Sequence, residues 1–111
     1  MLYLVHGEIV DPGYPVPPQQ FAEYVESRVI PSLERLVKLA AEGKVLAGGA
    51  PAGTRGTAFI VEAASNDEVG EILMSLPLWA LLKWQVTPLE SLQSRLNQVR
   101  QMLEQVKATL G

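Results

Sequence analysis

Apolar and polar residues alternate along this chain with two different periods, which predict strands and helices in turn. Runs rich in apolar and β-branched residues predict four strands, at 2–9, 45–50, 57–63 and 81–87. Apolar residues spaced three and four apart predict two helices, at 19–42 and 65–76. The order β-α-β-β-α-β is that of a ferredoxin-like sandwich, an α+β fold in which helices cover one face of a four-stranded antiparallel sheet. The other face of the sheet stays open and needs a cover.

Proline, glycine and capping residues set the expected limits of these elements. The proline-rich segment 11–18 predicts an extended loop, because proline fixes φ and removes backbone donors. Pro31 falls inside the first helix, which we expect to be kinked or divided there. A capping-box spacing that begins at Ser65 starts the second helix, and Pro77 ends it. The segment 51–56 predicts a hairpin loop between two strands. Its glycines and the pair Gly48-Gly49 could also admit a ligand close to the backbone, but their spacing fits neither a dinucleotide fingerprint nor a phosphate loop, so hairpin geometry is favoured.

The clearest periodicity lies near the C-terminus, where apolar residues alternate spacings of three and four over three heptads. These residues are Leu89, Leu92, Leu96, Val99, Leu103, Val106 and Leu110. Such a helix either pairs with its copy in another subunit or docks on an apolar surface of its own or a partner subunit. A parallel self-pair would set Arg95 against Arg100 of its mate, which is repulsive. We therefore favour docking on a more acidic surface such as the first helix, with Glu23, Glu26 and Glu34.

Composition limits the classes of protein to consider. At 111 residues the chain makes one structural domain, with a ferredoxin-like region at 1–88 and an oligomerisation or docking helix at 89–111. Hydrophobic residues make up 48% and charged residues 19%, which suggests apolar area buried between subunits of a homo-oligomer. The net charge of −3, without a basic stripe, argues against nucleic acid as a partner. The chain has no cysteine, which excludes disulfides and thiolate chemistry.

The sequence also predicts a cytoplasmic protein that binds no membrane. Its N-terminus has no basic region, and the apolar run there is interrupted by His6 and Glu8, unlike the run of a signal peptide. The nearly uncharged run 72–82 contains Pro77 and is shorter than the roughly 20 residues that span a bilayer.

Side-chain alternation places the polar residues of the strands on one face of the sheet. In the first strand, Leu2, Leu4, His6 and Glu8 share a face. Glu62 in the third strand and Lys83 and Gln85 in the fourth are expected on this same open face, while the apolar residues between them meet the helices. A register shift of one residue would invert each assignment.

Several short motifs resemble those of one family. They are the helix end Ala41-Glu42-Gly43, the glycine pair Gly48-Gly49, the strand Phe59-Ile-Val-Glu62 and the turn Leu73-Met-Ser-Leu-Pro-Leu78. Through them, residues 2–89 resemble the muconolactone isomerase-like family of the dimeric α/β-barrel superfamily. The resemblance implies a barrel-like dimer in which two sheets meet through their open faces, with a pocket between sheet and covering elements. It also implies larger rings of dimers, and a reaction that moves a proton within an unsaturated lactone without a cofactor.

The polar residues of the open face suit proton transfer, which gives an enzyme hypothesis. His6, the only histidine, titrates near neutrality and is the candidate catalytic base or acid, paired with Glu62. Desolvation in an apolar pocket would raise the pKa of Glu62 or Glu8 toward the same range. Glu8, Arg55 and Lys83 are the candidate substrate-binding residues, the two cations serving to hold a carboxylate or to stabilise an enolate-like charge.

Each of these residues also has a structural interpretation. A lone strand histidine is more often a hydrogen-bonded sheet residue, and no other residue stands at metal-ligand spacing from it, so we expect no metal. Glu62 and Lys83 would form a cross-strand ion pair, and Arg55 would stay solvated at the hairpin tip. Two functions therefore stay open. One is a cofactor-independent isomerase acting on a small unsaturated lactone or organic acid. The alternative is a non-catalytic homo-oligomeric assembly or a module that binds a small apolar or carboxylate ligand.

Overall fold

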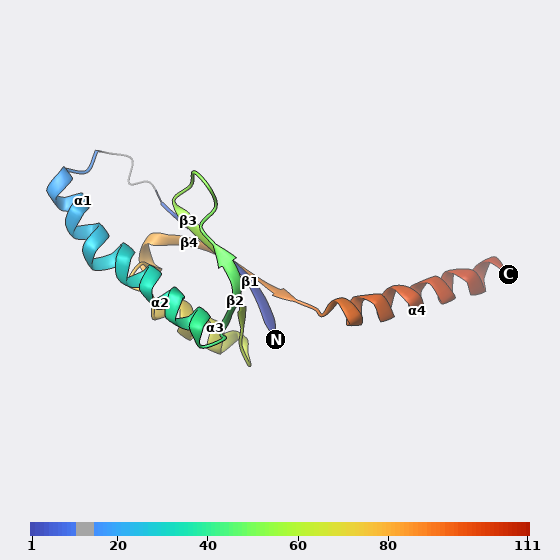
Figure 1. The fold of residues 1–111 in the computed structure, drawn as a ribbon. Coiled ribbons are helices and arrows are strands. Elements are labelled where there is room, and N and C mark those ends of the chain that lie inside the picture. The colour runs from blue at the N-terminus through green and yellow to red at the C-terminus, as the bar shows by residue number, and fades with distance from the viewer. Residues whose placement is uncertain (11–14) are drawn as a thin grey trace.

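A computed structural model describes residues 1–10 and 15–111 of the chain, and its element order is the expected one (Figure 1). The strands are β1 (Leu2–Ile9), β2 (Val45–Gly49), β3 (Gly56–Glu62) and β4 (Leu82–Leu89). The α-helices are α1 (Pro18–Tyr24), α2 (Ile30–Ala41), α3 (Asn66–Met74) and α4 (Leu92–Leu110). A short 3₁₀ turn, Trp79–Leu81, precedes β4. The extended loop expected at 11–18 lies outside the described residues at 11–14.

The four strands form one antiparallel sheet in the order β2-β3-β1-β4. In Figure 1 the helices α1, α2 and α3 lie together on one side of this sheet. This arrangement is the ferredoxin-like α+β sandwich that the order of elements predicts, and the fold class is confirmed. The central strand pair is β1–β3, with β2 and β4 at the edges.

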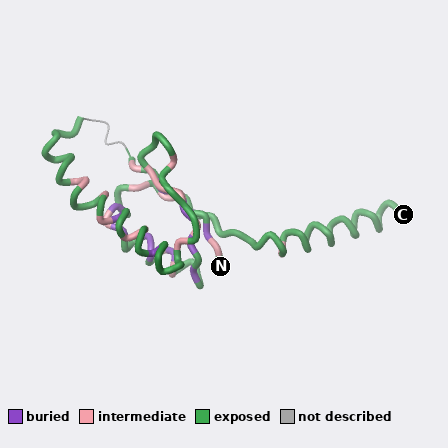
Figure 2. The backbone as a smooth tube through the Cα atoms, in the orientation of Figure 1, coloured by how far each residue is buried: buried purple, intermediate pink, exposed green. Residues whose placement is uncertain are grey.

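The hydrophobic core lies between the sheet and the helices, where the buried segments gather in Figure 2. It is built from Tyr3, Val5, Phe59 and Val61 on the strands and from Leu39, Val69, Ile72, Leu73 and Leu76 on or after the helices. Burial alternates along β1 as the pattern predicts, because Tyr3, Val5 and Gly7 are buried while Leu4 and Glu8 are exposed. The expected division into an apolar helix-side face and a polar open face is therefore confirmed.

The first helix is continuous, but a π-helical turn at Val25–Val29 joins α1 to α2 immediately before Pro31. The Ile30 N–H donates to the Val25 carbonyl, five residues back instead of four. In an α-helix the Pro31 ring would collide with the carbonyl four residues before it. The wider turn relieves this clash, which explains why the expected break takes the form of a π-helical turn.

Helix α3 begins with the predicted cap. The Ser65 Oγ accepts from the Glu68 N–H at 3.2 Å, while the Glu68 carboxylate accepts from the Ala64 N–H at 2.7 Å and pairs with Lys44. The helix ends at Met74, two residues before the expected end, and Leu76 packs into the core from the following turn.

Helix α4 projects away from the rest of the molecule (Figures 1 and 2). It has no buried residue, and its apolar side chains are exposed to between 42% and 90%. The helix therefore does not dock on its own domain, because β4 leads it away from α1 and α2. No helix in the described part of the chain is long and apolar enough to cross a membrane.

Candidate functional site

A cavity of about 320 Å³ lies between the first helix and the helix-side face of the sheet. One wall comes from α1, α2 and the π-helical turn that joins them, with Phe21, Tyr24, Val25, Val29, Leu33 and Leu36. The opposite wall comes from the sheet and its loops, with Ile9, Arg55, Gly56, Thr57, Leu82 and Trp84. None of the residues of α1 is buried, and the small residues Gly56 and Thr57 line the sheet side of the gap. The helix thus stands off from the sheet at this end and leaves room for a small molecule.

Arg55 is the one charged residue among the described residues that line this cavity, which is otherwise apolar apart from a few hydroxyl groups. A second cavity of about 290 Å³ shares Ile9, Phe21, Tyr24 and Arg55 with the first, and Arg55 is again its single charged residue among those described. The Arg55 carbonyl accepts from the Ile9 N–H at 2.8 Å, which ties the β2–β3 loop to the end of β1. Arg55 is exposed to solvent at the edge of the two cavities. A guanidinium beside apolar walls attracts an anionic group, so this site favours a small apolar molecule with a carboxylate or an enolate oxygen.

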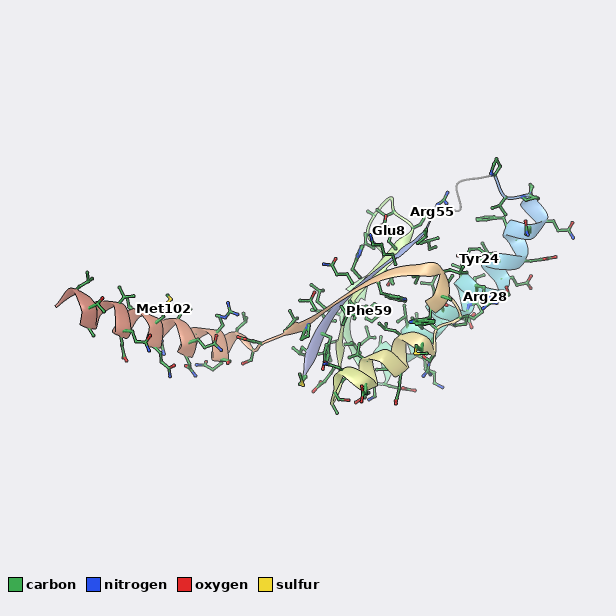
Figure 3. The ribbon with its side chains drawn as sticks, turned by 180° about the vertical axis from the view of Figure 1, so that it is seen from behind. Glu8, Tyr24, Arg28, Arg55, Phe59 and Met102 are labelled. Atoms are coloured by element: carbon green, nitrogen blue, oxygen red, sulfur yellow. The ribbon has the colours of Figure 1, made fainter. Side chains whose placement is uncertain are left out.

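The phenol of Tyr24 is the second polar group shared by the two cavities. Burial raises the pKa of Tyr24 above its usual value, and the nearby positive charge of Arg55 opposes this shift in part. Tyr24 therefore keeps its proton at neutral pH and can donate a hydrogen bond. Figure 3 shows Tyr24 on the helix and Arg55 on the loop between β2 and β3, both at the end of the molecule away from α4.

The indole of Trp84 forms part of the sheet-side wall and depends on a glycine in the neighbouring strand. Gly7 is the cross-strand partner of Trp84, and a Cβ at Gly7 would lie 2.6 Å from Trp84 Cζ3. The indole therefore occupies the space that a larger side chain at position 7 would fill. The Trp84 Nε1–H donates to the Trp79 carbonyl at 3.1 Å, which fixes the ring in this orientation.

Ser32 is the one buried polar residue among those described, and it lines the cavity from α2. Its Oγ accepts from the Leu78 N–H at 3.0 Å, which attaches the turn after α3 to the middle of the first helix. This bond satisfies a backbone donor that would otherwise be buried without a partner.

The residues predicted for catalysis and binding lie mainly on the other face of the sheet. His6 pairs in register with Gln85 on β4 and with Ala58 on β3, and Glu8 pairs with Lys83. His6 is half-buried, while Glu8 and Lys83 are exposed. One copy of the chain thus brings His6, Glu8 and Lys83 together on the open face.

Glu62 lies at the far end of that face. It pairs with Leu2, four residues along β3 from the position opposite His6, which is about 13 Å at the usual rise of a strand. The register also shows that the Glu62–Lys83 ion pair is wrong, since their strands flank β1 on opposite sides and the two residues lie at opposite ends of it. Within one chain Glu62 therefore does not meet the other candidates.

Arg55 is the one predicted site residue that lines this cavity, which lies on the helix side of the sheet. The pocket expected on the open face would form against a second subunit and stays a prediction. Tyr24, Ser32 and Trp84 were not among the predicted site residues. The sequence did offer a signal for Tyr24, because its polar hydroxyl group lies between Phe21 and Val25 of the apolar stripe. Ser32, a small polar residue within an apolar stripe, carried a similar signal. Among the described residues no group of three or more His, Asp or Glu side chains is placed to hold a metal ion.

Comparisons with known proteins agree with this architecture. Residues 1–95 match the family described as muconolactone delta-isomerase. The crystal structure of muconolactone isomerase at 3.3 Å resolution is similar, with a TM-score of 0.67, 22% identity and coverage of 82% of this chain and 90% of that one. A dehydrochlorinase for 5-chloro-2-hydroxyhydroquinone from Burkholderia phenoliruptrix AC1100, in complex with 2,5-dihydroxybenzoquinone, is also similar. Its TM-score is 0.58, with 21% identity and coverage of 85% of this chain and 98% of that one.

A comparison with curated sequences finds no match. At these identities the two solved structures support the fold, which the sheet order also shows. The family match covers the whole sheet, its helices and each residue that lines the cavity. The chain therefore belongs to the muconolactone delta-isomerase family.

Proposed function

We propose that this protein is a cofactor-independent isomerase that moves a proton within a small unsaturated lactone or a related ring-shaped organic acid. The observation that carries the proposal is the apolar cavity of about 320 Å³ with Arg55 as its single charged lining residue among those described. This volume suits one small ring. The two similar structures are an isomerase named for a lactone and a dehydrochlorinase that holds a quinone ring, which supports a compact ring as the ligand.

In this proposal Arg55 binds the carboxylate of the substrate. The neutral Tyr24 phenol donates a hydrogen bond to the oxygen on which negative charge develops when a ring C–H is deprotonated. The cavity has no histidine or carboxylate among its described lining residues, so the base comes from outside it. His6 and Glu8 lie on the opposite face of the sheet and do not reach this cavity, so in this proposal the base is a residue of another subunit that borders the cavity.

Self-association belongs to the same proposal. Apolar residues lie between the polar ones on the open face, and they include Leu4, which is 43% exposed and is flanked by Ile60 on β3. Leu2 and Leu89 extend this apolar area toward the end of the sheet. Burial of these side chains against a second sheet would form the dimer that the family resemblance implies.

Binding of muconolactone, followed through the fluorescence of the two tryptophans, of which Trp84 lines the cavity, tests the location of the site. Loss of a charge-assisted hydrogen bond costs about 1.5–3 kcal/mol, so Arg55→Gln should weaken binding roughly tenfold to a hundredfold. Lys83→Gln removes a cation from the open face and is the matched control, with unchanged affinity expected. Weaker binding by Lys83→Gln and unchanged binding by Arg55→Gln would place the ligand site on the open face. Equal affinities of the two variants would show that neither cation binds the ligand.

Proton transfer itself is tested by NMR in D₂O. The expected result is incorporation of deuterium into the ring carbons of muconolactone only when the protein is present. Tyr24→Phe should lower the rate of incorporation more than it lowers affinity, because the phenol acts on the developing charge. Binding without incorporation would favour the alternative function, a module that binds a small carboxylate ligand.

A further inference from the structure

Helix α4 carries an apolar stripe that the rest of its own chain does not cover. The α4 stripe consists of Leu92, Leu96, Val99, Leu103, Val106 and Leu110, and each of these residues is at least 42% exposed. In proteins most of the stability of a helix comes from packing of its apolar face, and α4 has no buried residue, so this stripe calls for a partner surface. Because the family match ends at residue 95, the family's own architecture does not account for most of α4.

The charges beside the α4 stripe indicate the kind of surface that fits it. With the stripe at heptad positions a and d, the flanking e and g positions hold Arg95, Arg100 and Lys107 and no acidic residue. Glu104 lies at an outer position, away from the stripe. Two α4 helices packed in parallel would bring these bases together, whereas an apolar surface with acidic neighbours would balance them.

Such a surface lies on the outer side of α2. The α2 stripe consists of Ile30, Leu33 and Val37, which are 46%, 48% and 70% exposed. Glu34 lies one turn from Ile30 and from Val37 on the same helix, and Glu23 and Glu26 are exposed farther toward its start.

The basic residues of the same helix mostly turn to its other side. Arg28 Nη1 donates to the Pro77 carbonyl at 3.3 Å, and Arg35 Nε donates to Ser75 Oγ at 3.4 Å. Both contacts lie toward the turn after α3, and Lys38 is the base that remains exposed near the stripe. The surface around the α2 stripe is therefore apolar with an acidic border.

We propose that α4 of one copy of this chain packs along the first helix of a second copy and covers its α2 stripe. The helix from Pro18 to Ala41 is about 36 Å long and α4 is about 28 Å long, so the lengths are compatible. The chain's own α2 is out of reach because α4 points away from it (Figure 1). Leu33 belongs to both the α2 stripe and the cavity wall, so the docked helix also closes one side of the cavity.

Cross-linking between single-cysteine variants tests this contact without reference to any reaction. The chain has no cysteine, so Ile30→Cys and Val99→Cys each carry one reactive thiol, at the start of the α2 stripe and near the middle of the α4 stripe. The two variants are mixed, allowed to exchange subunits, and treated with a short bismaleimide. A covalent dimer in the mixture, with little in either variant alone, is the expected result. Glu104→Cys is the matched control on the outer side of α4, and it should cross-link poorly to Ile30→Cys.

The other outcomes overturn the proposal. Efficient cross-linking of Val99→Cys to itself would show that two α4 helices pair with one another. A cross-linked monomer of the Ile30→Cys/Val99→Cys double variant at high dilution would show docking within one chain. A negative charge within the contact should weaken it, so Leu103→Glu added to Val99→Cys is expected to lower the yield about tenfold or more. Because α4 is outside the core, circular dichroism of this variant should still show the folded sheet domain, and an unchanged yield would contradict the docking.

Discussion

The close contact between Gly7 and Trp84 makes one substitution a strict test of the packing around the cavity. In Gly7→Ala the new Cβ would lie 2.6 Å from Trp84 Cζ3 and 2.8 Å from Cε3. Carbon atoms at rest lie about 3.5–4.0 Å apart, so the indole has to move by about 1 Å. That movement disturbs the wall of the cavity and the hydrogen bond that the Trp84 Nε1–H donates to the Trp79 carbonyl at 3.1 Å.

The expected cost follows from these contacts. Overpacking of this kind destabilises by about 1–3 kcal/mol, and we take about 2 kcal/mol as the central value. For a chain of 111 residues the unfolding entropy corresponds to about 4 °C per kcal/mol. Gly7→Ala should therefore lower Tm by about 8 °C.

Gly49→Ala is the matched control, because a Cβ at Gly49 would meet no atom within 4 Å. Replacement of glycine by alanine reduces the conformational entropy of the unfolded chain, so Gly49→Ala should gain about 0.4–1 kcal/mol of stability without the clash. Both variants should be melted at the same protein concentration and followed by tryptophan fluorescence. The packing described for Trp84 would be refuted if Gly7→Ala were as stable as Gly49→Ala.

Two further substitutions probe other parts of the fold. Ser32→Ala leaves the buried Leu78 N–H without its acceptor and should destabilise the protein by about 1–3 kcal/mol in urea unfolding. The exposed Ser27→Ala should change stability by less than about 0.5 kcal/mol, and equal effects would mean that Leu78 finds another partner. Hydrogen bonding to Lys44 lowers the pKa of Glu68 below its usual 4.5, so this group stabilises the fold above that pH and loses its contribution as pH falls through the lowered pKa. Glu68→Gln should therefore be less stable than the natural chain near neutral pH and approach it in acid, whereas a pH-independent difference would exclude the ion pair as the cause.

Strand limits and faces could be predicted because they depend on local alternation. The β1 segment begins and ends at the expected residues, and its buried and exposed residues fall on the predicted faces. β4 continues two residues past the expected end, through Pro88. Proline is tolerated there because β4 is an edge strand, where one side of the backbone needs no donor.

The register between neighbouring strands was harder to predict than the face of the sheet on which a residue lies. Alternation put His6 and Glu62 on one face, but only the pairing of β1 with β3 shows that they lie four positions apart. The cavity depends on how far α1 stands from the sheet, and no periodicity reports that distance. Arg55 was found among the candidates because a cation in a glycine-rich loop stands out, whereas Tyr24 looked like one more residue of the helical stripe.

The π-helical turn at Val25–Val29 lets the wall of the cavity tolerate a change of one residue in chain length. Such a turn holds one residue more than the α-helix around it and absorbs that residue locally. Loss of a single residue within the turn would therefore restore a regular α-helix and leave Phe21 and Tyr24 facing the cavity. Loss of a residue from α1 outside the turn, such as Ala22, would instead rotate Phe21 by about 100° around the helix axis and away from the cavity. Whether a one-residue deletion in this helix changes the pocket thus depends on whether it falls inside or outside the turn.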